Sequence, residues 1–245
     1  AKVTTIGDAV ELAMKTSRYE QDMDGLVDGN ALAGQDLWVN VSGDGDILTN
    51  AVSRYGGAGL GVRLVFNKAS DTAQRIVDRP VTFGTGIVVT KLRANRRSGA
   101  NVIASTAPGF GVAASGSVKF FVSIDSARAI RFFNGSTALI VDTLATMASQ
   151  TWQKFSVWMD RTTAASTVVR IYLDGKQIHE ETVDTTGIDN VRFATGATTT
   201  GVADTYFDEL RIGDDLEDDG TQDNIIDLGG VPTSGDAELS FNGEA

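Results

Sequence analysis

The order of apolar and polar residues along the chain predicts a protein built almost entirely of β-strands. From Leu37 onward the two kinds of residue alternate, and this spacing puts successive side chains on opposite faces of a strand. Glycine or short polar segments separate the runs, as is typical of the turns between strands. The runs cover residues 37–41, 60–66, 87–93, 101–106, 118–124, 129–133, 153–159, 167–173, 177–183, 190–194 and 205–212.

The segment ahead of these runs has a helical spacing instead. Ile6, Val10 and Met14 fall on one face of a short amphipathic helix predicted over residues 7–15. A helix of this length is marginal on its own in water. We therefore expect its apolar face to pack, either on the chain's own sandwich or on a neighbouring copy.

Turn residues favour antiparallel pairing. Asp174-Gly175 lies between two runs, and Asx-Gly suits a type I′ turn, which needs positive φ at both central positions. Asn134-Gly135 is a similar signal. Closely spaced strands with almost no helical pattern between them indicate two antiparallel sheets. We predict an all-β fold, a two-sheet antiparallel jelly-roll sandwich with one short N-terminal helix, over residues 23–213. Residues 1–22 form an N-terminal arm, and residues 214–245 an acidic segment packed on the sandwich or on a neighbour.

Composition excludes several function classes. Among 245 residues, 21 Lys and Arg oppose 32 Asp and Glu, a formal net charge of −11, which argues against nucleic-acid binding. Apolar runs are too short for membrane insertion. There is no cysteine, which excludes thiol catalysis and zinc-thiolate sites, and His179 is the single histidine. Catalysis that uses an imidazole would therefore depend on His179.

Five segments carry a recognisable pattern: residues 151–158 (TWQKFSVW), 169–176 (VRIYLDGK) and 206–213 (YFDELRIG), together with 23–25 (MDG) and 32–38 (LAGQDLW). They resemble segments of concanavalin A-like, laminin-G-like jelly rolls of the bacterial exported type. The resemblance implies two sheets, one of them concave, and a location outside the cell or on its surface. It also implies activities that range from carbohydrate binding and glycan cleavage to adhesion or scaffolding. In that family a structural calcium ion is often held by residues that correspond to Asp24 and Asp208, although Asp208 pairing with an arginine is the alternative.

Motifs for glycan cleavage are incomplete. Gln177-Ile178-His179 is similar to one motif of alginate-lyase jelly rolls, and residues 208–211 to another, but their order is reversed and a Tyr-rich strand motif is missing. The alternating acids of glucanase jelly rolls are also missing. We therefore predict no catalytic residues and a protein that is not an enzyme.

Aromatic side chains suggest a carbohydrate-binding surface. On the strand that follows Trp152, alternation puts Phe155, Val157 and Met159 on one face and Trp158 on the other. Trp152, Trp158 and Tyr172 can then form a platform for sugar rings, which stack on flat side chains. The alternative is that the tryptophans seal the edge of the sandwich.

Two interpretations of function follow. Terminal segments outside a sandwich fray unless they pack on something, and a neighbouring copy is one candidate. The first interpretation is a non-catalytic extracellular structural subunit of a self-assembling filament or surface layer, whose partners are copies of itself held through Ile6, Val10 and Met14. The alternative is a carbohydrate-binding module of a glycan-degrading or adhesive system, whose partner is a polysaccharide.

Overall fold

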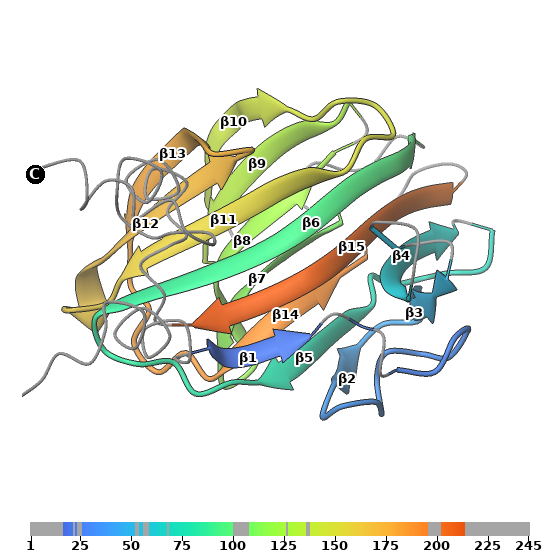
Figure 1. Ribbon diagram of the computed structural model, residues 1–245, viewed down its shortest axis with the longest axis horizontal. Helices are drawn as coiled ribbons and strands as arrows, with labels where there is room; N and C mark the ends of the chain where they lie inside the picture. The colour runs from blue at the N-terminus through green and yellow to red at the C-terminus, as the bar shows by residue number, and fades with distance from the viewer. Residues whose placement is uncertain are drawn as a thin grey trace, which may run out of the picture.

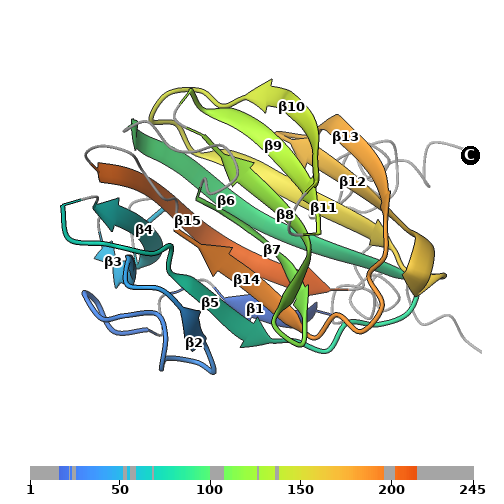
Figure 2. The ribbon, with the colours of Figure 1, turned by 180° about the vertical axis from the view of Figure 1, so that it is seen from behind.

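The computed structural model confirms the all-β prediction, with two antiparallel sheets packed face to face (Figures 1 and 2). The structure describes residues 17–21, 23, 26–51, 54–55, 59–67, 69–99, 108–125, 127–135, 138–195 and 202–213. The predicted helix over 7–15, the predicted strand over 101–106 and the acidic segment 214–245 lie outside these residues. Within the described part, no helix has the length and apolar content needed to cross a bilayer.

Sheet A has eight strands, in the order β13-β12-β11-β6-β15-β4-β3, with β1 paired to β15 (Figure 1). They are β1 (Ser17–Gln21), β3 (Asp46–Asn50), β4 (Gly61–Asn67), β6 (Ile87–Gly99), β11 (Gln153–Asp160), β12 (Thr167–Leu173), β13 (Lys176–Val183) and β15 (Val202–Gly213). Part of the predicted N-terminal arm thus forms β1 and adds to this sheet.

Sheet B has seven strands, in the order β10-β9-β8-β7-β14-β5-β2, and faces the viewer in Figure 2. They are β2 (Val39–Ser42), β5 (Ile76–Pro80), β7 (Gly109–Ala114), β8 (Ser117–Ile124), β9 (Ala129–Asn134), β10 (Ala138–Thr146) and β14 (Asn190–Ala194). A short 3₁₀ helix, η3 (Ala164–Ser166), precedes β12.

Aromatic rings from both sheets meet in the core. Phe193 of sheet B stacks on Trp38, with ring centroids 5.1 Å apart, and on Phe207 of sheet A, at 5.2 Å. Phe110 of sheet B meets Phe207 and Phe155 of sheet A edge to face, at 5.9 and 5.6 Å. These ring contacts hold the two sheets together, because each contact buries apolar surface from both sheets.

The hairpin predicted at Asp174-Gly175 is confirmed. Both residues have positive φ, 49° and 79°, and they join β12 to β13. Gly135, at the other predicted turn, has φ 67° and lies between β9 and β10. In both places the Asx-Gly pair predicted the turn correctly. Glycine favours such turns because it adopts positive φ at no steric cost.

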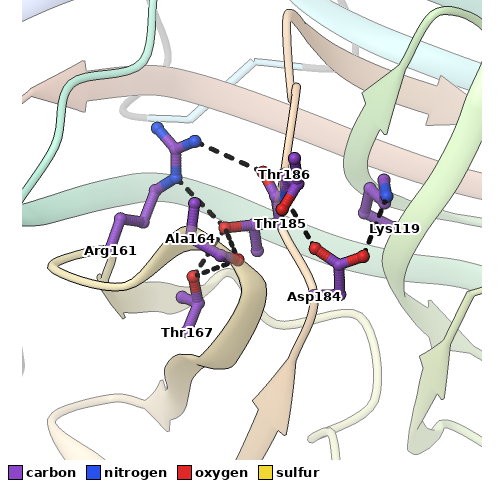
Figure 3. A network of polar contacts seen from close by, with 7 residues as sticks. All are labelled: Lys119, Arg161, Ala164, Thr167, Asp184, Thr185 and Thr186. Carbon is purple, nitrogen blue, oxygen red and sulfur yellow. Dashed lines mark hydrogen bonds and ion pairs between the residues drawn. The ribbon is translucent and has the colours of Figure 1, made fainter.

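A buried polar network lies around η3 and the start of β12, as Figure 3 shows. The hydroxyls of Thr167 and Thr185 lie 2.6 Å apart, and both side chains are fully buried. One hydroxyl donates to the other, and both oxygens lie within 3.3 Å of the Ala164 carbonyl oxygen. Arg161 donates its Nε–H to the Thr185 hydroxyl oxygen. These hydrogen bonds connect η3 and the start of β12 to the loop after β13. Buried polar groups of this kind are stable only when they are hydrogen-bonded.

Candidate functional site

The outer face of sheet A carries the side chains that alternation points away from the core. On β11, Phe155, Val157 and Met159 are buried in the main core, as the sequence pattern predicts. Trp158 instead joins a separate apolar cluster on the other face of the sheet, with Val89 of β6 and Tyr172 of β12. Two of the three predicted sugar-binding residues therefore lie together on this face.

Trp158 and Tyr172 are both covered, with 8% and 2% of their surface exposed. The guanidinium of Arg170 lies over the Trp158 ring, 4.3 Å from its centroid, and Arg170 also pairs with Glu180 at 2.6 Å. Among the described residues, the indole Nε1–H of Trp158 is buried without a hydrogen-bond partner. A buried donor that lacks a partner lowers the stability of the fold.

Trp152 belongs to a second aromatic cluster. Its ring meets Tyr55 edge to face, with centroids 6.0 Å apart, and the guanidinium of Arg93 lies 4.5 Å from the Tyr55 centroid. Tyr55 donates its backbone N–H to the Asp208 carboxylate at 2.7 Å, which holds it over sheet A. Trp152, Tyr55 and Arg93 are all half-buried. We call these three residues the Tyr55 cluster.

Tyr55 was not among the predicted site residues. The residues around Tyr55 do not alternate between apolar and polar, and Gly56-Gly57 comes directly after it, so the local sequence indicates only a loop. Its place above β6 and β15 is fixed by the Asp208 hydrogen bond, which joins residues 153 positions apart. The three predicted sugar-binding residues consequently divide between two clusters, and their role in binding carbohydrate stays a prediction.

Basic side chains share this face with the two aromatic clusters. In the strand register, Lys154 of β11 is opposite Arg93 of β6, and Lys91 of β6 is opposite both Ser156 and Arg211. At the β4 side, Arg63 pairs with Asp204 at 2.8 Å, and the hydrogen bond from this carboxylate raises the pKa of Arg63. Acidic side chains accompany these cations, since Arg93 pairs with Glu209 at 3.1 Å on the same face.

A β-bulge separates the two polar residues of the Gln-Ile-His motif. Gln177 is opposite Tyr172, whose hydroxyl donates to the Gln177 amide oxygen at 3.2 Å, but His179 is opposite the core residue Ile171. Residues two apart on a regular strand share a face, and the extra residue Ile178 breaks this rule. Gln177 therefore faces outward, while the His179 ring packs inward on Phe132, with centroids 4.8 Å apart.

Burial lowers the pKa of His179. The side chain is half-buried, its Nε2 has no hydrogen-bond partner in the described part of the chain, and desolvation lowers its pKa from 6.5, opposed by Glu181 and Glu180. The folded protein therefore binds this proton less readily than the unfolded chain. Stability should fall as the pH drops below 6.5, because the unfolded state takes up the proton more readily than the folded state there.

The variant His179→Gln tests this linkage. Its unfolding free energy should lack the loss that the unmodified protein shows as the pH decreases from about 7 toward 5, because glutamine does not titrate. Urea unfolding at several pH values measures the difference between the two proteins. Parallel pH profiles would show that His179 has the same pKa in the folded and unfolded states.

The predicted calcium site is only partly described. Asp208 is buried, and its carboxylate accepts the backbone N–H groups of Tyr55 and Glu209, at 2.7 and 2.8 Å. Asp24 lies outside the described residues. Within the described ranges no three His, Cys, Asp or Glu side chains lie close enough together to hold a metal ion. The described residues alone do not supply a calcium ligand set, and the site stays a prediction.

The predicted assembly residues Ile6, Val10 and Met14 also lie outside the described part of the chain. Self-association through them stays a prediction. The large apolar residues that the structure does show exposed lie at β2 and in the segments before it: Val27, Leu37, Val39 and Val41.

Comparison with known proteins gives the fold and no family. No family model matches the chain, and no curated protein matches it. Solved structures do. An endo-β-1,4-glucuronan lyase from the fungus Trichoderma reesei matches with a TM-score of 0.54 at 11% identity, over 81% of this chain and 95% of that chain. Alginate lyase vAL-1 from a Chlorella virus matches with a TM-score of 0.52 at 9% identity, over 75% and 99%.

A third similar structure is that of botulinum neurotoxin type C, a protein whose cell entry depends on interaction with two ganglioside molecules. It matches with a TM-score of 0.52 at 14% identity, over 91% of this chain and 53% of that chain. The similar structures are β-sandwiches and support the jelly-roll architecture, but none of the comparisons confirms membership in the concanavalin A-like family.

These comparisons correct our prediction that the chain is not an enzyme. Lyases that cleave glucuronan and alginate are built on the same fold. The prediction rested on His179 and on missing carboxylate motifs, but tyrosine and lysine also act as general acids and bases. Both residue types are present on the outer face of sheet A, for example Lys154 and Tyr206. Having one histidine therefore does not argue against catalysis on this fold.

Proposed function

We propose that this protein binds an acidic polysaccharide along the outer face of sheet A. The observation that carries the proposal is the placement of basic side chains between two aromatic clusters on one sheet face. The Tyr55 cluster lies at one end of β11, and Trp158 with Tyr172 lies toward the other. Lys154 and Lys91 are on the strands between them.

The size of this surface suits an extended chain ligand. Trp158 is six positions after Trp152, which corresponds to about 20 Å along a strand. A polysaccharide with several sugar rings would span this length. The half-buried rings of Trp152 and Tyr55 can contact the apolar faces of sugar rings, whereas Trp158 and Tyr172 are buried and only support the surface above them. Guanidinium and ammonium groups form charge-assisted hydrogen bonds with carboxylates. The combination favours a uronate chain over a neutral glycan.

The similar structures support this choice, since two of them are lyases named for glucuronan and alginate. Because these structures share only a fold with this chain, we propose the ligand class from the residues of this chain itself. The predicted extracellular or surface location agrees with a polysaccharide partner and remains part of the proposal.

Binding should be measured by calorimetry with polyglucuronate and alginate, and with dextran as a neutral control. We expect Arg93→Ala and Trp152→Ala each to weaken binding of the acidic chains by at least about tenfold, about 1.4 kcal/mol. Both variants remove half-buried groups of the Tyr55 cluster. The same samples are assayed for unsaturated chain ends, which a lyase releases.

The matched control is Lys119→Ala, which removes a cation from sheet B. Lys119 pairs with the exposed Asp184 at 3.5 Å and lies on the opposite layer of the sandwich. The affinity of the Lys119→Ala variant for the acidic chains should stay within about twofold of the affinity of the unmodified protein. Equal binding of dextran and polyglucuronate, or an equal loss in Lys119→Ala, would contradict the proposal.

Self-association is a second candidate function, and the edge strand β2 favours it. All four residues of β2 are exposed, and Val39 and Val41 expose 50% and 43% of their surface. The strand pairs with β5 and is at the end of sheet B. Exposed apolar edge strands are prone to pair with a second chain, so a copy of this protein is the partner that this edge suits.

A further inference from the structure

The outer face of sheet B holds a pocket of about 300 Å³ that the proposed function does not use. The strands around it, β5, β14, β7, β8 and β9, are neighbours in the sheet that faces the viewer in Figure 2. This layer is opposite the one that carries the Tyr55 cluster. The pocket is at the lower end of the volume range of small-molecule sites.

The floor of the pocket is aromatic. Phe121 of β8 and Phe133 of β9 are direct cross-strand partners, and both line the pocket. Phe121 fits close to the sheet because β7 carries glycine beneath it. A Cβ at Gly109 would stand 2.8 Å from the Phe121 ring, and one at Gly111 would stand 2.9 Å from it. Glycine weakens a strand, and here Gly109 and Gly111 leave room for the Phe121 ring against the backbone of β7.

One wall of the pocket is formed by Arg192, which is buried. Its Nε and Nη2 groups donate to Asp78 at 2.6 and 2.7 Å, and Nη2 also donates to the Gly116 carbonyl at 2.9 Å. These bonds fix the guanidinium and leave Nη1 without a hydrogen bond to any described residue. Gln74 and Ser117 add an amide and a hydroxyl to the same pocket.

The charge of this wall determines which ligand it favours. Arg192 and Asp78 form a bidentate pair and neutralise each other. A ligand carboxylate placed at Nη1 would also be repelled by Asp78, whereas a hydroxyl oxygen would accept the same hydrogen bond without that repulsion. A pyranose ring has an apolar C–H face for the phenylalanines and hydroxyls for the polar groups. We propose that this pocket binds one neutral pyranose ring, as a carbohydrate site independent of the acidic-polysaccharide face of sheet A.

The test follows backbone amide signals of the ¹⁵N-labelled full chain during titration with single sugars. The probes are the methyl glycosides of glucose, galactose, mannose and xylose, with glucuronate and benzoate as acidic comparisons. At least one neutral glycoside should give saturable shift changes at Gly116, Gly135 and Ala194, which line the pocket. Glucuronate and benzoate should bind at least about tenfold more weakly.

Two substitutions separate this pocket from the rest of the molecule. Ser117→Trp places a bulky ring at an exposed rim position and should reduce glycoside affinity at least about tenfold, while the matched variant Thr163→Trp, at an exposed loop position, should leave it unchanged. Arg93→Ala should lose polysaccharide affinity and keep glycoside binding, so the two proposals fail independently. Absence of shifts with all four glycosides, equal binding of the acids, or unchanged binding in Ser117→Trp would overturn the inference.

Discussion

Replacing Asp78 with alanine is expected to lower the free energy of unfolding by about 3–5 kcal/mol. The Asp78 carboxylate accepts two hydrogen bonds from Arg192, at 2.6 and 2.7 Å, and the two side chains expose only 5% and 6% of their surface. Removing the carboxylate leaves the Arg192 charge desolvated and without its counter-ion. Urea unfolding followed by circular dichroism measures the change.

An exposed ion pair provides the comparison. Arg170 and Glu180 lie 2.6 Å apart on sheet A, but 49% of the Glu180 side chain is exposed. The variant Glu180→Ala should therefore cost no more than about 1 kcal/mol. The double variant Asp78→Ala/Arg192→Met should regain part of the loss, because it removes the buried charge as well. Equal costs for Asp78→Ala and Glu180→Ala would show that the buried pair is well hydrated.

The same ion pair explains why the local sequence of β5 does not predict a strand. Its sequence, Ile-Val-Asp-Arg-Pro, has two adjacent charges and a proline, a composition more typical of loops than of strands. The strand forms because Arg192 of the neighbouring β14 neutralises Asp78. A partner 114 positions away in the sequence supplies what the local pattern lacks.

Strand β7 was missed for a different reason. Its sequence, Gly-Phe-Gly-Val-Ala-Ala, contains glycines that predict a turn when they are considered locally. In the fold these glycines lie in the middle of sheet B, where a Cβ at Gly109 would stand 2.0 Å from the Val122 carbonyl oxygen. The close approach of β8 requires glycine here, and no single-sequence pattern reveals such a neighbour. Strands with clear alternation, such as β11 and β12, were predicted nearly to their ends.

The candidate site was partly predictable. Alternation placed Trp158 on the outer face of its strand, and the structure shows the predicted residue Tyr172 beside it. The pattern could not show that Trp152 turns to Tyr55, because a loop residue is positioned by a hydrogen bond to a distant strand. It also could not show the bulge at Ile178, which removes His179 from the face of Gln177. Local spacing assigns faces only while the strand remains regular.

The core offers the second large effect. Replacing Phe193 with alanine is expected to cost about 3–5 kcal/mol of unfolding free energy. The ring is fully buried and stacks on both Trp38 and Phe207, so its removal leaves a cavity between the two sheets and deletes two aromatic contacts. For a chain of this size, the midpoint of thermal unfolding should fall by roughly 10 °C, measured by calorimetry.

The control for this variant is Phe121→Ala on the outer face of sheet B, where the ring is only half-buried. It should cost clearly less, because water can occupy the space that the ring leaves. Well below the unfolding midpoint, Phe193→Ala should still bind polyglucuronate within about twofold of the unmodified protein, since Phe193 faces the core and the Tyr55 cluster lies on the outer face of sheet A. A loss of binding in the folded variant would mean that the outer face depends on core packing, and that the proposed contacts of Arg93 and Trp152 are not sufficient to determine affinity.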